Sequence, residues 1–358
     1  MNHKFRILFI TDSKKKSSGG VKQLLYNAEA LKELGHKIYL SANKESFVAN
    51  KKDIFEEVHF IDSKSKLKSG LSLKKFISEK DIDIVHTFHN GGHKIAFLAK
   101  LFGGKFKLFI NRGVLKVPTN IFIYKSFMID GFICNSYACK NSLKRIFVSD
   151  KKINIIFNCI KSVASDKNFN KDDNRFTVLY IGNSSKIKGF DIFNEIVKRV
   201  PTNLDMEFIA LGVEKDKLSI NVDERINLPG TVKNVSDYLE KAHLFLLTSR
   251  SESFPNSLLE AMAFGLGVVA HNVGAVNDLI KDGVNGFKIN RLAVSEFVDK
   301  LIYLYNNRNL IKKMGHKNRL IVEKLNCKNK ALKLLKVYSG DHYLDNFDVI
   351  LENNCDDF

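Results

Sequence analysis

Short apolar runs alternate with segments of helical periodicity from the start of the chain. Residues 5–10 are apolar apart from Arg6, which is typical of a buried strand. Apolar residues then recur every three or four positions between 21 and 34, and Gly35 stands where a helix commonly ends. The next apolar run, 37–40, follows at once. This strand–helix–strand order predicts a parallel sheet with helices on both faces.

The alternation occurs twice within 358 residues, a length that accommodates two domains. A polar stretch at 161–175 is interpreted as a linker between the two sets of elements. Strands are expected at 58–61, 84–86, 107–110, 131–134, 176–181, 206–211, 244–247 and 267–270, and helices near 71–79 and 93–102. The chain is therefore predicted to be α/β, with Rossmann-like, doubly wound domains at 1–165 and 166–338 and an acidic tail at 339–358.

The net charge of +18 is distributed unevenly. Residues 1–160 contain 29 Lys and Arg against 13 Asp and Glu, whereas residues 161–358 contain 28 against 26. A basic first half favours an anionic partner. Charge alone does not distinguish a nucleotide, a phospholipid surface and a nucleic acid as that partner.

The five cysteines show neither CxxC pairing nor a Cys/His cluster at zinc spacing, so reduced thiols are expected. No apolar run is long enough for the core of a signal sequence or for a membrane span. We therefore expect a cytoplasmic chain, whose contact with the inner face of the cell membrane, if any, is peripheral.

The most informative segment is residues 249–263, SRSESFPNSLLEAMA, in which Glu252 and Glu260 are eight positions apart. Pro255 suits the first turn of a helix, so Glu252 should precede this helix and Glu260 should lie within it. The N-terminus of such a helix, placed just after a strand, is suited to hold phosphate. Taken alone, the segment is also compatible with an ordinary capped amphipathic helix.

This segment resembles the Glu-x7-Glu signature of the retaining GT-B glycosyltransferases, also called glycosyl transferases group 1 (family 4 type). The match continues downstream in GLGVVA at 265–270, VGA at 273–275 and DGVNGF at 282–287. The resemblance implies two Rossmann-like domains that face a central cleft. It also implies that Glu260 binds the nucleotide ribose and that Glu252 lies near the donor sugar.

A second loop, YIGNSSKIKG at 180–189, is similar to the family's Gly-Arg-x-x-x-x-Lys-Gly, whose cations hold the donor diphosphate. Lys188 fits this pattern, whereas Asn183 stands where arginine is usual, so Lys186 is the candidate for a replacement cation. In the first half, Gly19 and Gly20 resemble the family's Gly-Gly loop, and no GxGxxG fingerprint is present. The expected donor-binding residues are Gly19, Gly20, Gly182, Asn183, Lys186, Lys188, Phe254, Pro255, Asn256, Ser257 and Glu260.

The acceptor side is less well marked. The family often has a histidine after the strand that here is 107–110, and this chain has Asn111 and Arg112 there instead. His86 and His89, after the preceding strand, are the other candidates, although a lone histidine is commonly structural. We assign no catalytic base, because transfer from the front face can use the leaving diphosphate to assist the acceptor proton.

The sequence thus predicts a retaining glycosyltransferase in which Glu252 and Lys188 are the catalytic residues. The donor is a nucleotide-sugar, with UDP favoured, and the acceptor is a glycan or lipid-linked molecule of cell-surface polysaccharide or glycoconjugate synthesis. No metal or other cofactor is expected. Asp81-Ile82-Asp83 matches a metal-binding Asp-x-Asp motif, but we interpret it as a solvated turn. The alternatives are a GT-B epimerase or phosphorylase, or a non-enzymatic protein that binds anions or nucleic acid; no nucleic-acid motif supports the last.

The basic first half also predicts attraction to an anionic membrane, at about 1 kcal/mol for each Lys or Arg near the surface. The alternative is that the protein surface is generally rich in lysine, without a role in membrane binding. The candidate residues are Lys14, Lys15, Lys16, Lys64, Lys66, Lys68, Lys74 and Lys75, with Phe122 and Tyr124 as apolar contacts.

Overall fold

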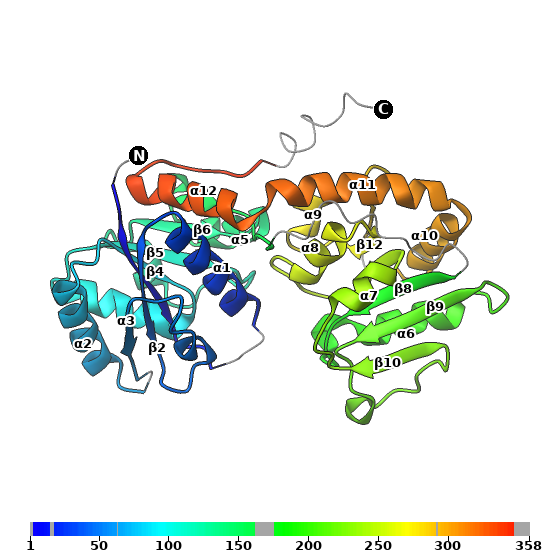
Figure 1. Cartoon of the computed structure of the whole chain (residues 1–358), viewed down its shortest axis with the longest axis horizontal. Helices are drawn as coiled ribbons and strands as arrows, with labels where there is room; N and C mark the ends of the chain where they lie inside the picture. Colours follow the sequence, from blue (N-terminus) through cyan, green and yellow to red (C-terminus); the bar gives the residue numbers. More distant parts are fainter. Residues whose placement is uncertain (1–2, 15–17, 63, 162–174, 291–292, 347–358) are drawn as a thin grey trace. The chain divides into compact units, whose positions relative to one another are not determined.

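The computed structural model describes residues 3–14, 18–62, 64–161, 175–290 and 293–346. Contacts between Cα atoms divide the chain into two compact units. Unit 1 comprises Met1–Lys161 and Leu325–Asp345, and unit 2 comprises Ser162–Lys324 and Asn346–Phe358. Each unit is built on its own parallel sheet (Figure 1).

The sheet of unit 1 has the strand order β3-β2-β1-β4-β5-β6-β7, and every pairing is parallel. Its strands are β1 Arg6–Thr11, β2 Lys37–Ala42, β3 Val58–Phe60, β4 Ile84–Thr87, β5 Lys107–Arg112, β6 Gly131–Cys134 and β7 Ile153–Ile155. In β1 the side chains from Ile7 to Ile10 have no exposed surface, because helices cover both faces of the sheet.

The helices of unit 1 are α1 Gly19–Glu33, α2 Lys66–Glu79, α3 Asn90–Leu101, α4 Ile121–Lys125, α5 Tyr137–Lys144 and α12 Cys327–Ser339. The sequence predicted the helix near 71–79 five residues too short at its start, and it did not anticipate the short strand β7. The four cysteines that the structure describes, Cys134, Cys139, Cys159 and Cys327, form no disulfide with one another.

Helix α12 packs in unit 1, although the division expected from the sequence put residues up to 338 in the second domain. Its apolar residues, including Leu334 and Tyr338, join the same buried cluster as Val21 and Leu24 of α1. The residues just after α12 also pack here: Asp345 accepts a hydrogen bond from the Phe157 backbone N–H at 2.7 Å. The first part of the expected acidic tail is therefore ordered on unit 1, and residues 347–358 lie outside the described residues.

The sheet of unit 2 has the order β10-β9-β8-β11-β12-β13, again with all pairings parallel. Its strands are β8 Phe176–Ile181, β9 Met206–Leu211, β10 Ile226–Gly230, β11 Leu244–Leu247, β12 Gly267–His271 and β13 Phe287–Ile289. Its helices are α6 Phe190–Arg199, α7 Ser236–Lys241, α8 Asn256–Ala263, α9 Val276–Leu279, α10 Val294–Asn306 and α11 Arg308–Lys324. The expected class, two doubly wound α/β domains, is confirmed. Among the described residues, no helix has the length and hydropathy needed to cross a membrane.

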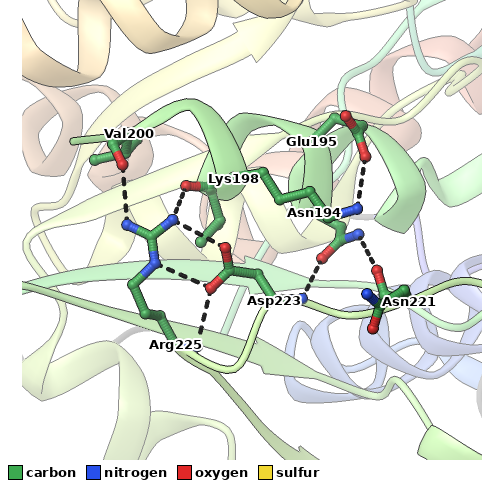
Figure 2. A network of polar contacts seen from close by, with 8 residues as sticks. Asn194, Glu195, Lys198, Val200, Asn221, Asp223 and Arg225 are labelled. Atoms are coloured by element: carbon green, nitrogen blue, oxygen red, sulfur yellow. Dashed lines mark hydrogen bonds and ion pairs between the residues drawn. The ribbon is translucent and has the colours of Figure 1, made fainter. Parts of the chain in front are cut away.

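A polar network in unit 2 fastens the C-terminal end of α6 (Figure 2). Arg225 pairs with Asp223 and donates to the carbonyl oxygens of Val200, at 2.9 Å, and Val197. Asn194 accepts from the Asp223 backbone N–H at 2.9 Å and so ties the same helix to the loop before β10. Arg225 thus supplies additional donors to carbonyl groups at the end of α6, which ties this helix to the segment before β10.

Candidate functional site

The strand order of unit 2 brings two loops together at one edge of the sheet. β8 and β11 are neighbours, but the chain leaves β8 toward β9 on one side and β11 toward β12 on the other. The loops that follow their carboxyl ends, 182–189 and 248–255, therefore meet at the topological switch point of the sheet. Ligands of doubly wound sheets bind in such a crevice.

Lys188 and Glu252, one from each loop, form an ion pair across this switch point. The Lys188 ammonium lies 2.6 Å from Oε1 of Glu252, which also accepts a hydrogen bond from the Ser249 hydroxyl at 2.9 Å. The Lys188 side chain is 33% exposed and the Glu252 side chain 12%. The two residues predicted to be catalytic thus contact each other, with the ammonium partly open to solvent.

Gly189 holds the Lys188 loop against the end of β11. Its φ of +71° is in the left-handed region, and a Cβ atom there would lie 2.0 Å from the Thr248 carbonyl oxygen. The Thr248 hydroxyl donates to the Gly189 carbonyl at 2.8 Å, and the Tyr180 hydroxyl donates to the Lys188 carbonyl at 3.1 Å. Burial raises the pKa of Tyr180, so this phenol stays a neutral donor.

Arg250 fastens the same loop from the other side, a role that the sequence analysis missed. Its guanidinium forms two bonds with the Asp191 carboxylate, at 2.7 and 2.6 Å, and donates to the Lys186 carbonyl at 2.7 Å. Hydrogen bonding from Arg250 holds the pKa of Asp191 below its usual value. Arg250 is therefore committed to Asp191 and to the Lys186 carbonyl, whereas Lys188 contacts Glu252.

Asn183, which stands where the family usually has arginine, organises its own loop. Its Oδ1 accepts hydrogen bonds from the Ser185 backbone N–H, at 3.1 Å, and from the Ser185 hydroxyl, at 2.6 Å. Gly182 bonds through its N–H to the Leu211 carbonyl at 3.0 Å, and the Lys186 side chain is exposed. Asparagine can accept these bonds, whereas arginine has no acceptor.

The backbone of Glu252 rests on the turn that follows β12. Gly274 has a φ of +55°, and a Cβ atom there would lie 2.0 Å from the Glu252 carbonyl oxygen. The Ala275 N–H donates to the Ser253 carbonyl at 3.0 Å, and the His271 ring bonds the Ser249 carbonyl at 2.8 Å. The VGA segment that the sequence analysis matched to the family is thus a support for the Glu252 loop.

Helix α8 begins at Asn256, one residue later than expected, because the sequence analysis placed Pro255 in the first turn. Pro255 is its N-cap residue, so no N-cap side chain satisfies the first-turn N–H groups. Glu252 precedes the helix, and Glu260 lies within it and is half-buried. Phe254 is buried and packs the loop, whereas Asn256 and Ser257 are partly exposed in the first turn. This end of α8 offers partial positive charge beside the Lys188–Glu252 pair.

In unit 1 the corresponding switch point lies between β1 and β4, where α1 and α3 begin. Gly19 and Gly20 open α1, whose N-cap Ser18 accepts from the Val21 N–H at 3.1 Å. The His89 ring bonds the Thr11 hydroxyl at 2.7 Å, and a Cβ atom at Gly20 would lie 3.1 Å from its Nε2. His89 is thus placed at the ligand-binding edge of this sheet, and burial lowers its pKa.

His86 does not lie on the acceptor side. Its ring is fully buried and bonds the Tyr338 hydroxyl of α12 at 2.6 Å. Burial lowers its pKa to about 3, with smaller contributions from Lys330 and His93. Local sequence patterns do not reveal this contact, because Tyr338 is 252 residues away along the chain. Asn111 and Arg112 do lie at the end of β5, Asn111 half-buried and Arg112 buried.

The membrane candidates are only partly where the sequence analysis expected them. Lys14 pairs with Glu45, and Lys15 and Lys16 lie outside the described residues. The others, Lys64, Lys66, Lys68, Lys74 and Lys75, lie in or next to α2, where Leu67 and Leu71 are exposed. Phe122 is 94% exposed, but Tyr124 is buried at 5% and cannot contact a surface, because its ring stacks on Phe132.

Asp81 and Asp83 both form structural contacts with Arg6. Asp81 pairs with Arg6 at 2.7 Å, and Asp83 accepts from the Arg6 backbone N–H at 2.7 Å. Within the described ranges, no group of three or more His, Cys, Asp or Glu residues could hold a metal ion.

Two family models match the chain: Glycosyltransferase Family 4 over residues 17–162 and Glycosyl transferases group 1 over residues 175–307. An uncharacterized glycosyltransferase from Haemophilus influenzae is 31% identical over 157 residues, which are 41% of this chain and 44% of that protein. The N-acetylgalactosamine-N,N'-diacetylbacillosaminyl-diphospho-undecaprenol 4-alpha-N-acetylgalactosaminyltransferase of Campylobacter jejuni is 28% identical over 229 residues, 58% of this chain and 62% of that enzyme. The chain thus spans about half of the length of these two relatives.

The architecture is also found among solved structures. Anabaena HepE in complex with UDP superposes with a TM-score of 0.80 at 16% identity, over 94% of this chain and 100% of that one. This likeness concerns the fold.

Proposed function

Because this chain is a GT-B glycosyltransferase of the group 1 and family 4 type, we propose that it transfers a sugar from a UDP-sugar to a glycan or lipid-linked acceptor, with retention of the anomeric configuration. The observation that carries this proposal is the Lys188–Glu252 pair at the switch point of unit 2, beside the N-terminus of α8. UDP as the nucleotide is supported by the UDP complex of the similarly folded Anabaena protein.

Lys188 neutralises the donor diphosphate in this scheme. An ammonium group has three N–H donors, so one can stay with Glu252 while the others bind phosphate oxygens. The ion pair also keeps the ammonium in place before the donor arrives, which lowers the cost of ordering it. Charge that develops on the leaving diphosphate is stabilised by Lys188 and by the first-turn N–H groups of α8.

Glu252 and Glu260 have different tasks. A carboxylate next to a diphosphate is repelled by it, so Glu252 accepts hydrogen bonds from the neutral hydroxyl groups of the donor sugar. Glu260, just over one turn into α8, accepts from the ribose hydroxyls. The acceptor hydroxyl gives its proton to the leaving diphosphate, and the chain mainly positions the two substrates.

The lipid-linked acceptor is supported by the Campylobacter relative, whose name describes a diphospho-undecaprenol substrate. The product then belongs to cell-surface polysaccharide or glycoconjugate synthesis. We place the reaction at the cytoplasmic face of the membrane, with unit 1 making peripheral contact through α2, where Lys64, Lys68 and Lys75 accompany exposed Leu67 and Leu71.

Mass spectrometry of reactions with a panel of nucleotide-sugars tests the transfer. Turnover of a UDP-sugar with an acceptor, and an unchanged anomeric configuration in the product by NMR, is the expected result. Epimerisation of the nucleotide-sugar without an acceptor would instead favour a GT-B epimerase.

Liposome co-sedimentation tests the membrane contact. We expect more protein bound to vesicles that contain anionic phospholipid than to neutral vesicles at low salt, and less at high salt. Equal binding to both kinds of vesicle would contradict this part of the proposal.

A further inference from the structure

A small pocket in unit 1 is lined by cations and by no carboxylate. Its volume is about 180 Å³, and its polar lining includes Arg112 of β5, His93 and Lys94 of α3, and Lys116 and Asn120 of the following loop. Ion pairs among the described residues involve none of Arg112, Lys94 and Lys116. Asp12, a carboxylate that also contacts α3, accepts from the Gly92 N–H at 3.4 Å and does not line the pocket.

Arg112 is the unusual member of this set. It is only 4% exposed, and buried arginines are normally paired with an anion, because burial of an unpaired charge costs several kcal/mol. Here its guanidinium donates to the Lys116 carbonyl and lies over the Tyr124 ring, 5.7 Å from its centre. Its Nε atom is buried and has no hydrogen-bond partner in the part of the chain that is described.

The surroundings orient this guanidinium rather than neutralise it. The Tyr124 ring is itself fixed by stacking on Phe132, with ring centres 5.4 Å apart. His93 bonds the Tyr124 hydroxyl at 3.3 Å, and burial, helped by His89 and Arg112, lowers its pKa to about 3. His93 is therefore neutral at physiological pH, and the charge of the pocket comes from Arg112, Lys94 and Lys116.

From this arrangement we propose that the pocket binds a phosphate or diphosphate group of the acceptor. Three cations without a carboxylate match a multiply charged anion better than a single carboxylate, and a planar guanidinium binds phosphate oxygens in pairs. An apolar rim adjoins the site: Ile121 and Phe122 are 44% and 94% exposed and stand between the lining residues Asn120 and Ile123. Such a rim suits an isoprenoid chain attached to the phosphate.

This inference rests on the proposed transfer and specifies its acceptor. The phosphate could belong to a lipid diphosphate or to a soluble phosphorylated sugar, and both share the same charged group. Phe122 distinguishes them by the apolar area buried, because an isoprenoid chain buries much more apolar surface against its ring than a polar sugar does.

Calorimetry with inorganic pyrophosphate, in the presence of saturating UDP, tests the pocket separately from the donor site. We expect pyrophosphate to bind the wild-type protein, and the surface variant Lys94→Ala/Lys116→Ala to bind it at least about tenfold more weakly. Arg112→Met should show a larger loss and Arg112→Lys a smaller one. Lys125→Ala is the matched control, because Lys125 is an exposed lysine of α4 outside the pocket.

Absence of pyrophosphate binding, or equal binding by wild type and the Lys94→Ala/Lys116→Ala variant, would overturn the proposal. UDP affinity, measured in the same variants, should stay unchanged, so a failure of this pocket is distinguishable from a failure of the donor site. Farnesyl diphosphate then identifies the source: tighter binding than pyrophosphate, lost in Phe122→Ser, supports a lipid-linked acceptor. Equal binding of the two probes supports the phosphate site with a soluble acceptor.

Discussion

Gly274→Ala is expected to abolish most of the transfer activity although Gly274 carries no functional group. Its φ of +55° alone costs an alanine about 1–2 kcal/mol, and the new Cβ atom would lie 2.0 Å from the Glu252 carbonyl oxygen. Ordinary contact needs about 3.4 Å or more, so the Glu252 backbone must retreat by more than about 1 Å. A displacement of that size at a reacting centre costs on the order of 100-fold in rate.

Gly283→Ala is the matched control for this prediction. Gly283 lies in the same unit with a φ of +73°, but a Cβ atom there has nothing within 4 Å. Both variants therefore pay the conformational cost, and only Gly274→Ala displaces Glu252. Thermal unfolding and the transfer rate should be measured for both. If the two variants retain equal activity, Gly274 does not position Glu252 and the reasoning is refuted.

Four further outcomes are expected. Lys188→Ala should weaken UDP binding by roughly 10- to 150-fold in calorimetry, because one ionic contact of about 1.5–3 kcal/mol is lost; an unchanged affinity, equal to that of the exposed-lysine control Lys215→Ala, would contradict its role. Glu260→Ala should weaken UDP binding but not pyrophosphate binding, because it removes a ribose contact. Dialysis against EDTA should leave transfer intact, because Lys188 and α8 supply the positive charge; a loss that Mg²⁺ restores would show a metal requirement. The folded pKa of His86 is about 3 against about 6.5 when unfolded, so below pH 6.5 the unfolded chain binds the additional proton and stability falls toward pH 3. By pH 5 this protonation lowers the free energy of unfolding by about 2 kcal/mol relative to pH 7. Denaturant titrations of His86→Gln should show a smaller decrease in this free energy between pH 7 and pH 5. The same pH dependence in both proteins would argue against a contribution from His86.

Much of the fold was readable in the sequence because its signals are local. Apolar runs such as 176–181 and helical spacing such as that of 21–34 reflect burial of single strands and helix faces. The position of Pro255 likewise indicated the start of α8 to within one residue, and thus that Glu252 precedes it. Local patterns do not reveal which distant segments pack together, so the membership of α12 in unit 1 was missed.

The donor site was specified partly by local sequence and partly by tertiary structure. The residue types and spacing of the 252–260 segment and of Lys188-Gly189 pointed to the donor loops, but their mutual contact was decided by the strand order β9-β8-β11-β12. His86 is the clearest example. Its place in a strand was predicted from the sequence, but its hydrogen bond to Tyr338 depends on a helix at the other end of the chain. The same holds for Arg112, whose burial without a carboxylate follows from the loop and helix that cover β5. Pairing over such distances is specified by sheet order and side-chain packing, which only the tertiary structure determines.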